Sequence, residues 1–213
     1  MSSSLFPESH PGRAGIEIRE LITSSLARAK PAVAGDADLN PGYARAPRPL
    51  RPAAVLVGLV ERPAGTTVLF TRRTDGLRHH AGQISFPGGG CEPEDADATA
   101  CALRETREEI GLEAGWIEVV GRLNSYVTGT GYAITPVVGF IRPGFAVTPD
   151  PSEVAEIFEV PLAFLLDPAN HQRGSRTIAG ATRHFYAIPY GDYYIWGATA
   201  SMLVDLHRKV YGR

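Results

Sequence analysis

Residues 104–109 (RETREE) carry acidic side chains at a spacing that suits one side of a helix. In a helix, Glu105 would lie beside Glu108 and Glu109, because residues three and four positions apart are neighbours. Like charges at this spacing destabilise an isolated helix, and Mg²⁺ prefers oxygen ligands. We therefore predict that these three glutamates hold a divalent cation, with Arg104 orienting Glu108. The alternative interpretation is a solvated acidic face held by arginine–glutamate pairs.

The neighbouring residues predict how this helix is positioned. Residues 88–90 (GGG) permit backbone conformations that a Cβ atom would disfavour, so we expect a tight turn before an acidic loop. Asp95 or Asp97 can cap the helix that follows the loop. Gly111 is placed to end it.

Residues 86–112 as a whole resemble the Nudix box, G-x5-E-x7-R-E-U-x-E-E-x-G-U, of the Nudix hydrolases. The positions in register are Gly90, Arg104, Glu105, Glu108, Glu109, Gly111 and Leu112. Ala96 stands where the box has its first glutamate, and Thr106 stands where it has an apolar residue. In the family that glutamate supports the turn, and an acidic neighbour at position 94, 95 or 97 can serve instead.

The resemblance implies an α/β fold, specifically a Nudix-type α/β/α sandwich with a mixed β-sheet between helices. It also implies hydrolysis of a pyrophosphate with Mg²⁺ or Mn²⁺. The helix glutamates would hold the cation, and a backbone carbonyl in the glycine turn, at Gly88, would complete its ligands. The family often places a further carboxylate, as metal ligand or general base, where this chain has Glu153, with Glu156 in reserve. A capped, exposed turn is the alternative for that segment.

A second resemblance precedes the box, over residues 69–89. This segment is similar to the signature L-L-T-x-R-[ST]-x3-R-x3-G-x3-F-P-G-G, found in Nudix enzymes that hydrolyse coenzyme A. Arg72, Arg73 and Arg78 would concentrate positive charge beside the acidic metal site and contact phosphate, which guanidinium groups bind bidentately. Gly82 of the signature joins this expected substrate site. Without the signature, the arginines would be surface charges at the end of a strand.

Tyr132 lies in the glycine-rich segment 124–140, which resembles the family's segment before its ITPVVG strand. An aromatic ring at this place can stack on adenine, so Tyr132 is predicted to contact substrate. Packing within the core or the loop is the alternative.

The rest of the sequence predicts an N-terminal helix and a proline-rich linker or wrapping arm at 1–50, followed by a Nudix hydrolase domain at 51–213. The expected N-terminal helix covers residues 16–30. Apolar runs predict strands at 53–60, 66–72, 84–86, 116–123, 134–141 and 154–160. A short helix is expected at 161–166, a hairpin at 183–189 and 193–196, and a closing helix at 198–210.

Composition narrows the class of protein. The net charge of −2 does not favour nucleic acid as a partner, and no apolar run reaches the length of a membrane span. Cys91 and Cys101 are the only cysteines, which we interpret as small buried residues without a disulfide, in a reducing compartment. We expect a cytoplasmic protein with no membrane partner, and a homodimer is compatible with the sequence.

The sequence thus predicts metal-dependent hydrolysis of coenzyme A or acyl-CoA to 3′,5′-ADP and 4′-phosphopantetheine or its acyl form. One alternative is the same chemistry on another nucleoside diphosphate linked to a second group, such as ADP-ribose or a dinucleotide. The other is a Nudix-fold sensor that binds a nucleotide without cleaving it. Loss of the box carboxylates would indicate the sensor, and apart from Ala96 they are present.

Overall fold

The computed structural model describes residues 13–41, 49–74, 82–178 and 180–212. Arg78, one of the predicted phosphate contacts, lies outside the described residues. The helices are α1 (Arg13–Arg28), α2 (Asp36–Leu39), α3 (Ala98–Ile110), α4 (Leu162–Leu165) and α5 (Ala198–Tyr211), with 3₁₀ turns at Ala114–Trp116 and Pro168–Asn170. None of the helices in these ranges has both the length and the apolar character needed to cross a bilayer.

A mixed sheet forms the centre of the molecule, as expected for the α/β class. Its strands are β1 (Val33–Gly35), β2 (Arg51–Val60), β3 (Thr67–Arg73), β4 (Ile84–Ser85), β5 (Gly88–Gly90), β6 (Ile117–Arg122), β7 (Ser125–Val127), β8 (Tyr132–Ile141) and β9 (Val154–Pro161). The main path runs β1-β7-β8-β2-β3-β4, while β5 pairs with β2, β6 with β8, and β9 with β3. Strands β2 and β8 run parallel along their full lengths, and their continuous apolar sequences fit strands buried on both faces.

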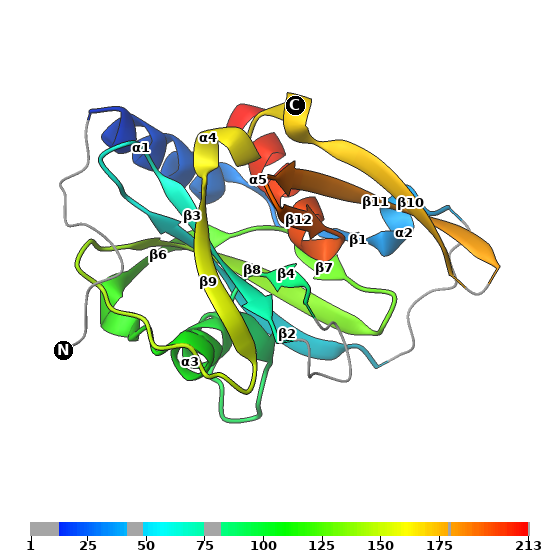
Figure 1. Ribbon diagram of the computed structural model, residues 1–213, viewed down its shortest axis with the longest axis horizontal. Coiled ribbons are helices and arrows are strands. Elements are labelled where there is room, and N and C mark those ends of the chain that lie inside the picture. Colours follow the sequence, from blue (N-terminus) through cyan, green and yellow to red (C-terminus); the bar gives the residue numbers. More distant parts are fainter. Residues whose placement is uncertain (1–12, 42–48, 75–81, 179, 213) are drawn as a thin grey trace.

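Helices cover both faces of this sheet, with α1 and α5 on one side and α3 on the other (Figure 1). Side chains of β3 alternate between the two cores, as the period of a strand requires. Val68 and Phe70 belong to the cluster that includes α1 and α5, whereas Leu69 packs in the cluster that includes Ile110 of α3. The sandwich that the family resemblance implied is therefore present.

The N-terminal segment folds onto the sheet. The predicted helix at 16–30 is found as α1, whose Ile22 is fully buried in the core. Part of the proline-rich segment then adds β1 parallel to β7. Asp36, which follows β1, accepts a hydrogen bond from the hydroxyl of Tyr126 at 2.6 Å and one from the backbone N–H of Gly129 at 2.6 Å. Within residues 31–41, β1 and Asp36 therefore hold this segment against β7 and the residues that follow it.

A separate antiparallel sheet contains β10 (Gln172–Ile178), β11 (Ala181–Tyr190) and β12 (Tyr193–Trp196). The predicted hairpin is β11 and β12, and Tyr190 pairs with Tyr193 across its turn. Strand β10 was not predicted because its sequence, QRGSRTI, lacks an apolar alternation. It is fixed by its partner, since the ring of Phe185 on β11 lies over Gly174 where a Cβ atom would stand.

Candidate active site

Helix α3 begins and ends where the sequence predicts. Of the two candidate caps, Asp97 is the one at the N-terminus, and its carboxylate accepts hydrogen bonds from the N–H groups of Thr99 and Ala100 at 2.8 and 2.9 Å. Gly111 ends the helix in a left-handed conformation with φ of 67°, which favours glycine. These two ends fix where α3 begins and ends, and therefore which part of the chain presents the glutamates.

The glycine segment differs from the expected turn, because Gly88–Gly90 form strand β5 and pair antiparallel with Ala53–Val55 of β2. The pairing holds the segment against α3. A Cβ atom on Gly89 would collide with the carboxylate of Glu105. Glycine at this position therefore lets the carboxylate lie against the backbone.

The three helix glutamates have different environments. The side chains of Glu105 and Glu109 are 18% and 7% exposed, whereas that of Glu108 is 53% exposed. Burial raises the pKa of Glu109 to about 7, and the backbone N–H of Gly88, which donates to it at 3.0 Å, opposes the rise. Burial also raises the pKa of Glu105, with Arg104 opposing. Both carboxyl groups thus lie where their charge is costly without a cation.

Arg104 connects the acidic loop to the helix. Its Nε and Nη2 atoms donate to the two carboxylate oxygens of Asp95 at 3.0 and 2.9 Å, and Nη2 also donates to the carbonyl of Gly90 at 3.0 Å. Its Nη1 atom lies 3.0 Å from an oxygen of Glu105 and 3.0 Å from one of Glu108. Arg104 therefore orients Glu108 as expected. Asp95, the residue before Ala96, is the acidic residue of the loop that pairs with Arg104.

Arg73 and Glu153 close the opposite side of the acidic cluster. The Nη1 and Nη2 atoms of Arg73 lie 3.7 Å from carboxylate oxygens of Glu109 and Glu153, respectively. Its buried Nε atom has no hydrogen-bond partner among the described residues. Glu153 is 48% exposed and raises the pKa of both Glu105 and Glu109 by its charge. Arg73 therefore lies between Glu109 and Glu153, and the charge of Glu153 also acts on Glu105.

Arg72 does not join this cluster. Adjacent residues of a strand point to opposite faces, so Arg72 lies on the other side of β3 from Arg73. Its Nε atom is 3.1 Å from a carboxylate oxygen of Glu156, the reserve candidate, and the other oxygen of Glu156 accepts a hydrogen bond from the Tyr193 hydroxyl at 2.6 Å. The expectation that both strand arginines stand beside the metal site is thus wrong for Arg72.

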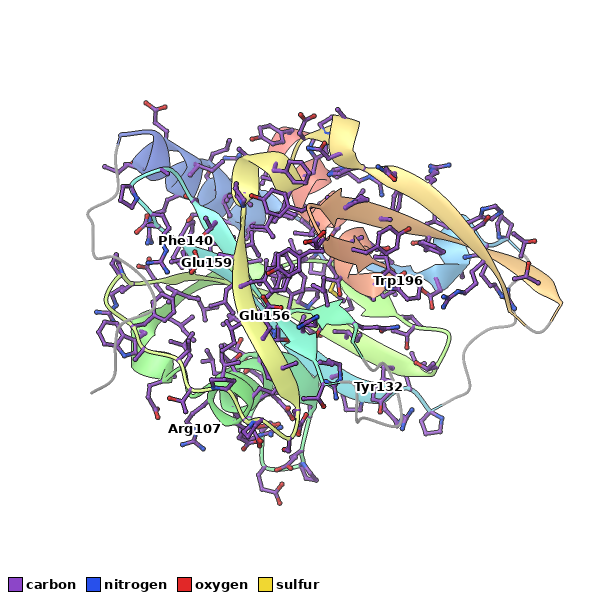
Figure 2. The ribbon with its side chains drawn as sticks, viewed as in Figure 1. Arg107, Tyr132, Phe140, Glu156, Glu159 and Trp196 are labelled. Atoms are coloured by element: carbon purple, nitrogen blue, oxygen red, sulfur yellow. A yellow bond between two sulfur atoms is a disulfide. The ribbon has the colours of Figure 1, made fainter. Side chains whose placement is uncertain are left out.

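Arg72 and Gly82 line a cleft of about 860 Å³ between the central sheet and the three-stranded sheet. Figure 2 shows Glu156 on β9 and Trp196 on β12, two residues that also line this cleft. We call it the aromatic cleft, and its lining includes Arg72, Gly82, Arg176, Tyr193, Tyr194 and Trp196. Sequence reasoning assigned these aromatic residues to a hairpin and to a structural role, and not to a site.

Tyr132 lies elsewhere, at the first residue of β8. The guanidinium group of Arg51 covers its ring, 3.9 Å from the ring centroid. The contact with Arg51 supports the alternative, in which Tyr132 packs locally. Stacking of Tyr132 on adenine stays a prediction.

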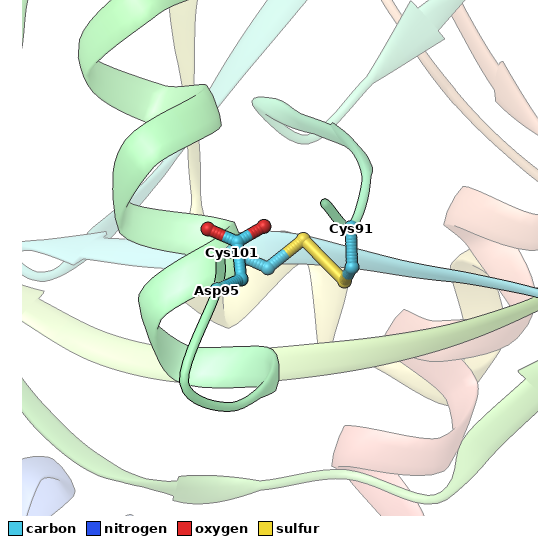
Figure 3. A group of neighbouring side chains, drawn as sticks. All are labelled: Cys91, Asp95 and Cys101. Atoms are coloured by element: carbon cyan, nitrogen blue, oxygen red, sulfur yellow. A yellow bond between two sulfur atoms is a disulfide. The ribbon is translucent and has the colours of Figure 1, made fainter. Parts of the chain in front are cut away.

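Cys91 and Cys101 form a disulfide (Figure 3), which corrects the expectation that the two residues carry free thiols. It joins the end of the glycine segment to the first turns of α3. Pairing of β5 with β2 on one side and capping by Asp97 on the other bring the two cysteines together. The carboxylate of Asp95 lies beside them, within 4.8 Å of the sulfur atoms.

The donor set fits a hard divalent cation. Carboxylates supply the oxygen ligands that Mg²⁺ and Mn²⁺ prefer. Glu105 and Glu109 are held against the glycine segment, with the more exposed Glu108 nearby, and Gly89 leaves the space that a side chain would fill. These glutamates would hold the ion, and the carbonyl of Gly88 stays a predicted further ligand.

Several known proteins are similar to this chain. The sequence model of the NUDIX domain matches residues 49–179. An uncharacterized Nudix hydrolase NudL of Photorhabdus laumondii is 39% identical over 160 residues, which are 75% of this chain and 85% of that protein. The protein of the same name from Shigella flexneri serotype 5b is 38% identical over 172 residues, covering 81% and 89%. Among solved structures, the Nudix hydrolase RenU of M. smegmatis aligns with 24% identity, a TM-score of 0.44, and coverage of 55% and 74%.

Proposed function

The chain belongs to the Nudix hydrolase family, and from that premise we propose that it hydrolyses the pyrophosphate of coenzyme A or acyl-CoA. The products would be 3′,5′-ADP and 4′-phosphopantetheine or its acyl form. The signature at residues 69–89 supports this choice of substrate within the family. The homologous NudL proteins do not decide it, because they are themselves uncharacterized.

The observation that carries the proposal is the position of Arg73 beside the acidic cluster. A guanidinium group 3.7 Å from Glu109 and from Glu153, with an unpartnered Nε atom in the described part of the chain, is suited to bind a phosphate oxygen. A substrate phosphate would thus lie between Arg73 and the carboxylates. Positioning of this kind is the main contribution that a protein makes to phosphoryl transfer.

The reaction needs a water oxygen to form a bond to one phosphorus while the bridging phosphorus–oxygen bond breaks. The departing phosphate keeps the electron pair of that bond. Bound Mg²⁺ or Mn²⁺ supplies charge neutralisation and a lower pKa for water. Glu153, which is 48% exposed and pairs only loosely with Arg73, is suited to take the proton from the attacking water. Arg104 acts indirectly, by holding Glu105 and Glu108 in place.

Product identification tests the proposal. The protein is incubated with coenzyme A and Mg²⁺ or Mn²⁺, with a chelator in the control, and the products are identified by mass spectrometry. We expect 3′,5′-ADP and 4′-phosphopantetheine only when the cation is present. ADP-ribose and a dinucleotide are assayed in parallel. Faster turnover of either one would contradict the coenzyme A assignment, and binding without turnover of any of them would favour the sensor.

A further inference from the structure

We propose that the aromatic cleft binds the adenosine 3′-phosphate end of the substrate, with Trp196 stacking on the purine and Arg176 contacting the phosphate. This inference rests on the proposed function and assigns to it a substrate subsite. The subsite lies on the opposite face of β3 from the acidic cluster. Part of its wall comes from the three-stranded sheet β10–β12, which is separate from the central sheet.

The first argument is the distance between the two places. Glu153 faces the acidic cluster and Glu156 lines the aromatic cleft, three residues further along the chain. Glu153 lies in the turn just before β9, and three residues of chain span at most roughly 11 Å, so the backbone positions of the two glutamates are no farther apart than that. Arg73 and Arg72 mark the same two places on β3. An extended substrate can therefore place its pyrophosphate at the cluster and its nucleotide end in the cleft.

The second argument is that the aromatic wall is already fixed. Tyr193 stacks on Phe158 with ring centroids 3.7 Å apart, and its hydroxyl is held by Glu156. The ring of Trp196 meets Phe185 edge-on at 5.0 Å. Neither ring has to be ordered when a ligand binds, which lowers the entropic cost of association. A purine has a flat face that such rings bind by stacking.

The third argument is the available positive charge. Arg176 lies with its guanidinium carbon 5.5 Å from the centre of the Trp196 ring, and no described carboxylate pairs with it. Arg72 offsets the charge of Glu156, whose other oxygen accepts a hydrogen bond from Tyr193. Asp192, at the hairpin tip, is the other carboxylate of the lining and can accept a hydrogen bond from a ribose hydroxyl or the adenine amino group. The phosphate is therefore assigned to Arg176.

The fourth argument concerns the boundary of the family match. The matched segment ends at residue 179, before β11 and β12, which contribute Trp196 to the cleft. The residues that carry the chemistry all lie within the match. The aromatic residues Tyr193 and Trp196 thus lie outside the family match, whereas Arg176 of the same cleft lies within it.

Tryptophan fluorescence offers a direct test. The chain has two tryptophans, so a Trp116→Phe background leaves Trp196 as the single reporter. We expect 3′,5′-ADP, added without metal, to change its emission at lower concentration than 5′-ADP does. An unchanged emission at saturating 3′,5′-ADP, with binding verified by calorimetry, would place the nucleotide elsewhere and overturn the proposal.

Variants test the phosphate contact. Arg176→Gln should weaken binding of 3′,5′-ADP by about tenfold or more, the scale of a lost charge-assisted hydrogen bond, and leave 5′-ADP within about twofold. The matched control is Arg173→Gln, which changes the same residue type on the same strand but on its other face. It should bind both nucleotides like the parent. Equal weakening of both nucleotides by Arg176→Gln, or none, would overturn the phosphate assignment.

Trp196→Leu should weaken both nucleotides, and Trp196→Phe should restore most of the binding because it keeps a stacking face. Thermal unfolding of each variant separates a folding defect from a lost contact.

The proposed function and the proposed subsite fail differently. Coenzyme A turnover that is insensitive to Arg176→Gln would remove the subsite and keep the function, whereas intact nucleotide binding without any turnover would remove the function and keep the subsite.

Discussion

Asp95 and Arg104 form a bidentate ion pair, in which Nε and Nη2 of the arginine lie 3.0 and 2.9 Å from the two carboxylate oxygens. The Asp95 side chain is only 7% exposed, and the arginine holds the pKa of that carboxyl below its ordinary value. Asp95 directly precedes Ala96, the position at which the Nudix box has a glutamate. It therefore keeps the acidic loop attached to α3 in a chain that lacks the usual residue.

The first prediction is that Asp95→Asn lowers kcat by about 10- to 100-fold, the usual effect of losing a partner that orients a metal ligand. Arg104 would then hold Glu105 and Glu108 less firmly. Ala96→Glu alone should change kcat little, and in the Asp95→Asn background it should restore part of the loss. Steady-state kinetics of the two single variants and the double variant measure this. A large gain from Ala96→Glu in the parent would instead indicate a naturally impaired site.

The second prediction concerns the helix carboxylates. Glu108→Gln and Glu109→Gln should each reduce turnover by at least ~10²-fold, the scale of a lost base or strong electrostatic contact. Glu109→Gln should also weaken Mn²⁺ binding more than Glu108→Gln, because Glu109 is 7% exposed and Glu108 is 53% exposed. Calorimetric titration with Mn²⁺ measures the affinity. Near-normal rates in both folded variants would show that the cation is held elsewhere.

Local sequence patterns predicted the parts of the site that depend on local structure. The cap at Asp97 and the left-handed Gly111 follow from backbone preferences that act within a few residues. The long strands β2 and β8 follow from apolar runs. Helix geometry placed Glu105 and Glu109 side by side, and the family resemblance implied that a backbone carbonyl of the glycine segment lies near them.

The remaining features depend on contacts between distant segments. Strands β1 and β7 have three residues each, and they form because β1 pairs with β7 and β7 in turn pairs with β8. Whether Arg72 or Arg73 faces the acidic cluster is decided by the register and face of β3, which a sequence motif does not contain. The Cys91–Cys101 bond likewise depends on how β5 and α3 are brought together.

The third prediction is a pH dependence of stability in the metal-free protein. The pKa of Glu109 is raised from 4.5 to about 7, so its protonated form stabilises the fold. That contribution is complete below about pH 4.5 and is lost as the pH rises through about 7. The free energy of unfolding should therefore fall by about 3 kcal/mol over this interval.

Denaturant unfolding at pH 5 and pH 8, in the presence of a chelator, measures this effect. Glu109→Gln should lack this component, whereas Glu113→Gln, an exposed control just past the helix, should keep it. Added Mg²⁺ or Mn²⁺ should reduce the loss at pH 8, because a bound cation favours the charged carboxylates. An identical pH slope in the parent and Glu109→Gln would show that another group is responsible.

The last prediction concerns the disulfide that joins the glycine segment to α3. Cys91 and Cys101 are separated by ten positions, and closing a loop of that length in the unfolded chain stabilises a fold by roughly 2–3 kcal/mol. Reduction should therefore lower the Tm by roughly 5–10 °C for a chain of this size. The double variant Cys91→Ser/Cys101→Ser should show the same lowered Tm with or without reductant, which separates loss of the bond from other effects of the reagent.

Because the bond fixes the segment that faces Glu105, kcat should fall with the Tm in the reduced protein and in the variant alike. A Tm and a kcat that do not respond to reduction, in protein whose disulfide is verified by mass spectrometry, would show that strand pairing and the Asp95–Arg104 pair are sufficient to hold the site.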